Sequence, residues 1–185
     1  AASVARAETT AADAPLVSFG LTTDVQYADA EPEGERHYRE SIPKLKAAVA
    51  DLAKQNLPFT LHLGDMIDRE FASFASILAL FQPLGHPVRH LLGNHDYNVV
   101  DAEKSHIVST LGMPADYYGF TTSGVRFLID QDGRNPAGFR VPKFGNLALH
   151  PEGADRFHGQ RLPAGHEIDF GGFRPAVNVL HLRRL

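Results

Sequence analysis

Three short polar motifs, each placed directly after an apolar run, constrain this chain more than any other feature of its sequence. The motifs are Asp24-Val25-Gln26, Gly64-Asp65-Met66-Ile67-Asp68 and Gly93-Asn94-His95-Asp96. The preceding runs, residues 16–23, 59–63 and 88–92, are short and apolar, as expected of strands that are buried on both faces. Each motif is therefore predicted to follow the end of a strand.

Two helices are expected between these strands. Apolar residues recur at helical spacing over residues 42–52, after Ser41 as the expected N-cap, and this pattern ends at Asn56. The same spacing recurs over residues 71–81 until Pro83 stops it. The order β-α-β-α-β predicts an α/β fold with a parallel sheet and flanking helices, in which the three motif loops meet at one edge.

The side chains expected at this edge carry the oxygen ligands that divalent cations prefer. The carboxylate of Asp65 can bridge two ions, Asp24 and Gln26 can hold one of them, and Asn94 can hold the other. Such a shell suits Mn²⁺, Mg²⁺ or Fe better than an ion that prefers thiolates, and the chain has no Cys. We therefore expect a site for two divalent metal ions that hydrolyses phosphate esters.

The third motif also supplies a candidate acid. We expect His95 to protonate the leaving oxygen and Asp96 to orient its ring. Gly64 and Gly93 would let the backbone turn sharply beside the metals. Taken singly, these residues also fit an ordinary turn, loop or helix cap, so the prediction depends on all three motifs occurring in order.

The motifs resemble the N-terminal half of the calcineurin-like metallophosphoesterase superfamily, in which the first motif is usually Asp-x-His. Gln26 departs from that pattern, but residues 24–29 and 36–41 together resemble one branch, the manganese-dependent ADP-ribose/CDP-alcohol diphosphatases, which tolerates Gln there. The resemblance implies two metal ions, with Mn²⁺ favoured over Fe, Mg²⁺ or Zn²⁺. It also implies hydrolysis of a phosphoanhydride or phosphodiester bond in a small nucleotide-like substrate. It covers residues 16–132, where residues 117–120 and 125–130 resemble the next pair of strands.

The rest of the family's metal shell has no clear counterpart in this chain. Members of the superfamily add a further His after a strand and a terminal Gly-His-x-His, whereas here Gly165-His166 lacks the second His. We interpret the remaining histidines as solvent-facing or loop residues, with ligation as the alternative: His150, His158, His166 and His181. We accordingly expect a segment 1–15 without a structural pattern, a core over residues 16–133 and a divergent or truncated tail over residues 134–185. We also expect an apolar face of the sheet to be left uncovered.

Composition limits the partners and the location that we expect. A net charge of −4 and a pI near 6.2 provide no basic face for nucleic acid, and no apolar run approaches the roughly 20 residues of a membrane span. Ala5-Arg6-Ala7 fits the Ala-x-Ala cleavage rule, which favours an exported or periplasmic protein over a cytoplasmic one with an Ala-rich segment. The sequence does not determine the oligomeric state.

Three functional hypotheses follow. The first is a dinuclear phosphoesterase that acts on a small nucleotide-like phosphate ester, and the second is a general or cyclic-nucleotide phosphodiesterase. The third is a non-catalytic fold that binds at most one metal ion because the distal ligands are missing.

Overall fold

The computed structural model describes residues 14–130, 146–151, 166–169 and 178–184. Residues 1–13, on which the expectation of export depends, lie outside the described residues, as does His158. From residue 130 onward the backbone alone is described.

The first sheet contains the three predicted parallel strands. β1 (Val17–Thr22), β2 (Thr60–His62) and β3 (Val88–His90) run in parallel, in the spatial order β3-β2-β1. Two strands from the tail continue this sheet beyond β1: β8 (Asn178–Arg184) pairs antiparallel with β1, and β7 (His166–Asp169) pairs with β8. The predicted β-α-β-α-β order is confirmed, with each strand one or two residues shorter at its ends than its apolar run.

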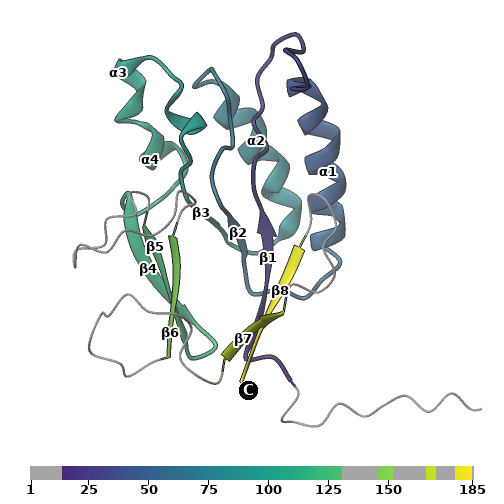
Figure 1. The fold of residues 1–185 in the computed structure, drawn as a ribbon, viewed down its shortest axis with the longest axis vertical. Coiled ribbons are helices and arrows are strands. Elements are labelled where there is room, and N and C mark those ends of the chain that lie inside the picture. Colours follow the sequence, from purple (N-terminus) through teal and green to yellow (C-terminus); the bar gives the residue numbers. More distant parts are fainter. Residues whose placement is uncertain (1–13, 131–145, 152–165, 170–177, 185) are drawn as a thin grey trace, which may run out of the picture.

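Two helices cover one face of this sheet, as Figure 1 shows. They are α1 (Ser41–Leu52) and α2 (Ser73–Phe81), whose apolar sides pack with the sheet into one core cluster. The expectation that Ser41 caps α1 is wrong. A 3₁₀ turn, η1 (Tyr38–Glu40), runs directly into the helix, so Ser41 already has helical geometry and Glu40 is the capping residue.

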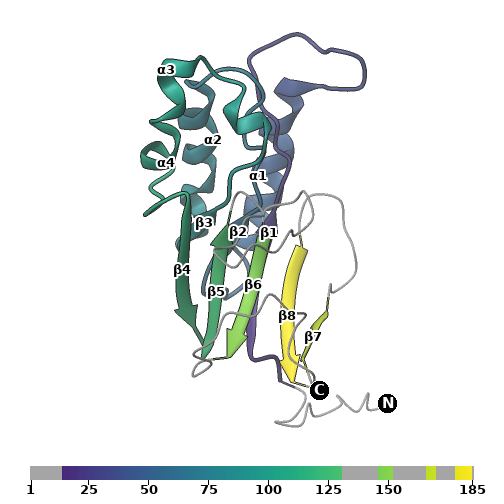
Figure 2. The same cartoon turned by 60° about the vertical axis from the view of Figure 1, so that its left-hand side comes forward.

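A second sheet covers the opposite face. It consists of β4 (Tyr117–Thr122), β5 (Val125–Asp130) and β6 (Asn146–Pro151), all antiparallel (Figure 2). β4 and β5 are the strand pair that the family resemblance predicted. Phe19 and Phe59 stack with ring centroids 4.9 Å apart, and Phe127 meets both rings edge-on. The expectation of an uncovered apolar sheet face is therefore wrong, because β5 covers β1 and β2 with buried side chains.

The other described elements are short. They are η2 (Gln82–Leu84), η3 (His95–Tyr97), α3 (Asp101–Lys104) and α4 (Ile107–Thr110). No helix among the described residues has both the length and the apolar character needed to cross a bilayer.

Strand register places three of the tail histidines by their backbones. His181 pairs with Ser18, which precedes the end of β1 at Thr22 by about 13 Å of strand. His166 pairs with Arg184, which lies two residues past Leu182, the partner of Val17 at the start of β1. His150 pairs with Arg126, next to the β4–β5 turn. In the first sheet, His166 and His181 therefore lie toward the amino end of β1, whereas the motif loops leave from the carboxyl ends of the parallel strands.

The histidines of β2 and β3 are core residues. His62 and His90 are paired across β2 and β3, with ring centroids 5.7 Å apart, and both are buried. Burial lowers the pKa of His90 to about 4 and, together with the charge of His90, holds the pKa of His62 well below its usual value. Both rings are therefore neutral in the folded protein at neutral pH.

This neutral pair predicts sensitivity to acid. The unfolded state binds a proton at His90 near pH 6.5 whereas the folded state does so near pH 4, so stability is fully present above pH 6.5 and falls as the pH drops through this window. Between pH 7.5 and 4.5, the free energy of unfolding measured in urea should fall by up to about 3 kcal/mol more in wild type than in His90→Gln. Gln55→Ala, at an exposed residue without a titratable group, is the control and should change stability equally at every pH. Equal pH dependence in wild type and His90→Gln would contradict the assignment.

Candidate active site

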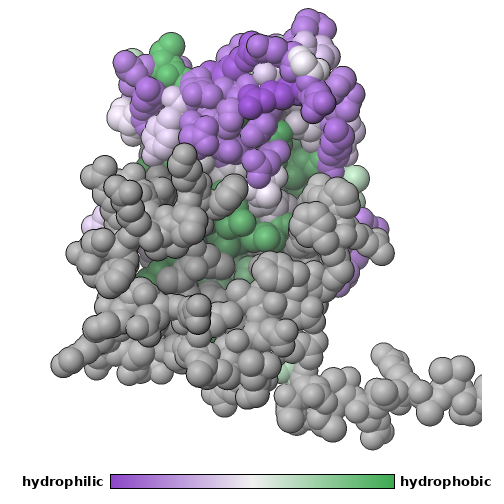
Figure 3. Space-filling view, in the orientation of Figure 1, coloured by the Kyte–Doolittle hydropathy of each residue, from purple (hydrophilic) through white to green (hydrophobic). Residues whose placement is uncertain are grey.

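The three motif loops lie against one another at the carboxyl ends of β1, β2 and β3. The backbone N–H groups of Asp24 and Gln26 donate to the carbonyls of Gly64 and Asp65, at 3.2 and 2.8 Å. The N–H of His95 donates to Oδ1 of Asp65, at 2.9 Å. This is the convergence that the parallel strand order predicts, and in Figure 3 hydrophilic residues gather on this part of the surface.

Two glycines allow the second and third loops to approach so closely. Gly64 has φ +94°, and a Cβ built on it would lie 2.4 Å from the backbone nitrogen of Gly93. A Cβ on Gly93 would lie 2.0 Å from Oδ1 of Asp65. Any side chain at either position would push the two loops apart.

Three of the four predicted metal ligands have strained backbones. Asp24, Gln26 and Asp65 have φ values of 53°, 43° and 55°, in the left-handed region that residues with a Cβ seldom adopt. Ser123 is the only other non-glycine residue with positive φ in the described part of the chain. Such strain persists only where the surrounding structure enforces it, and it is concentrated at functional sites.

The carboxylates of Asp24 and Asp65 fit a divalent cation because neither has a cationic partner among the described residues. Asp24 accepts from the hydroxyl of Thr23 at 2.6 Å and lies 3.5 Å from Nε2 of Gln26. The described residues contain no group of three His, Cys, Asp or Glu side chains that could hold a metal ion. The predicted set contains two residues of these types, Asp24 and Asp65, because Gln26 and Asn94 contribute amide oxygens.

Asn94 is available for the role that the sequence predicts. It is exposed and precedes η3, and its side chain does not cap that turn. It stands between Gly93 and His95 in the third loop. We retain Asn94 with Asp24, Gln26 and Asp65 as the candidate metal ligands.

Asp96 has a different role from the one predicted. Its carboxylate accepts four backbone N–H groups: those of Asp65, Met66, Ile67 and Gly93, at 2.7 to 3.2 Å. The prediction that Asp96 orients His95 is therefore wrong, since its oxygens are directed to the loop backbones. Burial raises the pKa of Asp96 to about 6, although the four donors act in the opposite direction.

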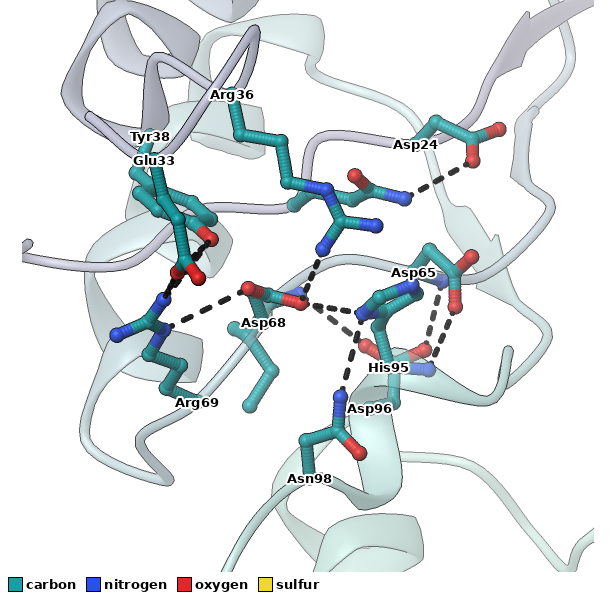
Figure 4. Close-up of polar contacts among 12 residues, drawn as sticks. Asp24, Glu33, Arg36, Tyr38, Asp65, Asp68, Arg69, His95, Asp96 and Asn98 are labelled. Carbon is teal, nitrogen blue, oxygen red and sulfur yellow. Dashed lines mark hydrogen bonds and ion pairs between the residues drawn. The ribbon is translucent and has the colours of Figure 1, made fainter.

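Asp68 takes the place beside His95 (Figure 4). Its Oδ1 is in close contact with Nδ1 of His95, and its side chain is almost fully buried. A carboxylate accepts, so Nδ1 carries a proton and Nε2 is the nitrogen that can exchange one with a substrate. No role of its own was assigned to Asp68 from the sequence, and its place three residues after Asp65 in the second motif was the available signal.

A pocket of about 450 Å³ opens beside this pair. Asp68 and His95 line it. The other lining residues are Glu33 and Arg36 from the loop before η1, Tyr38 from η1, Arg69 from the loop after β2, and Asn98. Arg36 donates to Oδ1 of Asp68 at 3.4 Å, and Arg69 lies 3.7 Å from Oδ2. The pocket thus combines an acid–base group with two arginines and two carboxylates, and the half-exposed guanidinium of Arg36 is the group suited to an anionic ligand.

The calcineurin-like phosphoesterase family model matches residues 17–164, and the chain belongs to this family. The match extends past residue 133 into the segment assigned to the tail.

Several manganese-dependent ADP-ribose/CDP-alcohol diphosphatases are similar in sequence. The one from Oryza sativa is 38% identical over 125 residues, which cover 58% of this chain and 38% of the relative. The one from Mus musculus is 32% identical over 140 residues, covering 68% and 37%. A dimetal phosphatase structure from Danio rerio has a TM-score of 0.50 at 27% identity, covering 60% of this chain and 42% of that one. The chain thus spans about two fifths of the length of these relatives.

The hydrogen bonds of Asp96 predict a large effect on stability. Asp96→Ala leaves four backbone donors without an acceptor, and each such donor costs roughly 1–3 kcal/mol, so the free energy of unfolding should fall by about 3 kcal/mol or more. Urea unfolding in the presence of a chelator measures this without any contribution from metal binding. Asp101→Ala, at an exposed aspartate paired with Lys104, is the control and should change stability by less than about 0.5 kcal/mol. If both variants behave alike, Asp96 does not brace the loops.

Proposed function

We propose that this protein is a dinuclear metal-dependent phosphoesterase that hydrolyses phosphodiester or phosphoanhydride bonds in small nucleotide-like substrates. The observation that carries the proposal is the pair of carboxylates without cationic partners, Asp24 and Asp65, on strained loops beside the Asp68–His95 pair. The names of the curated relatives support a diphosphate such as ADP-ribose or a CDP-alcohol as the substrate.

Asp24, Gln26, Asp65 and Asn94 would hold the ions, with Mn²⁺ favoured by the names of the relatives. When bound, the ions would supply an activated water and neutralise charge on the phosphoryl oxygens. Asp65 is suited to a shared position because the N–H of His95 holds one of its oxygens in place.

The chain's own residues provide binding and proton transfer. Arg36 is about half exposed in the pocket, and its bond to Asp68 leaves most of its five N–H donors for a phosphate group. His95, held through Nδ1 by Asp68, would donate a proton from Nε2 to the leaving oxygen. Asp68 would stabilise the charged ring before that transfer.

A second candidate is a form with impaired or no turnover. It is supported by the strand registers, which place the backbones of His166 and His181 away from the motif edge. With the proximal ligands alone, one ion would keep about three protein ligands while its neighbour kept Asp65, Asn94 and water, and so would bind weakly.

Metal binding separates these candidates. Calorimetric titration of the full chain with Mn²⁺ should show binding that Asp65→Ala abolishes, because this carboxylate serves both ions. Asp116→Ala, at an exposed aspartate that precedes β4, is the control and should bind as wild type does. One tight and one weak site would support the second candidate, whereas two tight sites with turnover would show that residues of the tail complete the shell.

The role of His95 predicts a dependence on the leaving group. His95→Ala should slow esters with poor leaving groups by about 10²–10⁴-fold and esters of p-nitrophenol much less, since a good leaving group needs no acid. Asp68→Asn should show the same trend more weakly, because the ring remains but loses its charged partner. Equal slowing of both kinds of ester would remove His95 from the acid role.

A further inference from the structure

The loop between β1 and η1 contains a tight hairpin whose two ends serve different residues of the pocket. Glu33 and Arg36 exchange both backbone hydrogen bonds, at 3.0 and 3.1 Å. Gly34 lies at the first central position with φ +60°, the position at which type II′ turns take glycine. The reciprocal bonds mean that a displacement of Glu33 also displaces Arg36.

Arg69, in the loop after β2, holds the Glu33 end of this hairpin. Its guanidinium is in close contact with the Glu33 carboxylate, donates to the hydroxyl of Tyr38 at 3.0 Å and lies 4.9 Å from the centre of the Tyr38 ring. Tyr38 is only 2% exposed and its hydroxyl donates to Glu33 at 3.4 Å. The Glu33 and Arg69 side chains are themselves exposed, and what distinguishes their contact is that Arg69 also lies on a buried ring.

The other end of the hairpin reaches the Asp68–His95 pair. Arg36 donates a hydrogen bond to Asp68, and Asp68 also contacts His95 (Figure 4). Asp68 therefore links the hairpin to the candidate acid. Arg69 differs from Arg36 because one terminal nitrogen of its guanidinium donates to both Glu33 and Tyr38.

We propose that Arg69 is a positioning residue, which through Glu33 and the hairpin fixes Arg36 beside the Asp68–His95 pair and thereby sets the affinity of the pocket for substrate. This rests on the proposed function for the identity of the substrate, but the positioning itself does not. Breaking the contact between Arg69 and Glu33 leaves the acid and the metal ligands in place. It should therefore weaken binding of an anionic substrate and leave the chemical step little changed.

If Arg69 bound the substrate directly, substitution of Glu33 would have the opposite effect on substrate binding. If Arg69 contacted the substrate, Glu33→Gln would free its guanidinium and strengthen binding. If Arg69 positions the hairpin, Glu33→Gln and Arg69→Ala both break the same contact and weaken binding, and the double variant is no worse than either single one.

Kinetics of the Mn²⁺-loaded full chain with ADP-ribose test this. Glu33→Gln should raise KM by about tenfold with kcat within about twofold, and Arg69→Ala, which also removes the cation that lies 3.7 Å from Asp68, should raise KM at least as much. Arg39→Ala is the matched control, since Arg39 pairs with Asp29 and Glu31 in the same loop rather than with Glu33 or Arg36 of the hairpin. A lower KM in Glu33→Gln, a kcat loss in Glu33→Gln, or an equal rise in KM in Arg39→Ala would overturn the proposal.

Hydrogen exchange provides a readout that does not need activity. The amides of Glu33 and Arg36, protected by the hairpin bonds, should exchange several times faster in Arg69→Ala and Glu33→Gln than in wild type and Arg39→Ala. Unchanged exchange would overturn the positioning role whatever the kinetics show. Faster exchange in these two variants, together with no turnover of diphosphates by the wild type, would support the positioning role and contradict the proposed function.

Discussion

The carboxylate of Asp96 is the interaction on which the rest of the site depends. It is fully buried and accepts backbone N–H groups from both the second and the third motif loop. These bonds, together with the contact between Gly64 and Gly93, hold two loops at a separation that no side chain at the glycines would permit. The position of Asp65, and with it the geometry of the candidate metal centre, follows from this brace.

The acidic residues of the site divide by their partners, and this division separates structural from chemical roles. Asp96 is satisfied by backbone donors, and Asp68 by His95, Arg36 and Arg69. Asp24 and Asp65 have no cationic partner among the described residues. A bound cation can neutralise a negative charge that no protein cation compensates. The two carboxylates without a cationic partner among the described residues are therefore the ones suited to metal.

Most of the first sheet and its helices could be predicted from the local pattern of apolar residues. The apolar runs before each motif have the length and character of buried strands, and the spacing over residues 42–52 and 71–81 is helical, so element type followed from period. The N-terminus of α1 was missed because η1 runs into it without a capping side chain. The cover of the second face was missed because it depends on the packing of Phe127 against Phe19 and Phe59, which come from distant parts of the chain.

By itself the sequence determined which side chains meet at the sheet edge, because parallel strands joined by right-handed crossovers bring their carboxyl ends together whatever the details of packing. Only the tertiary structure decided what each acid does. Asp68 and Asp96 both follow the motif glycines, and their roles differ because one oxygen pair faces a ring nitrogen and the other faces backbone N–H groups. The direction of a carboxylate is set by φ, by close backbone approach and by burial, and none of these is encoded in spacing along the chain.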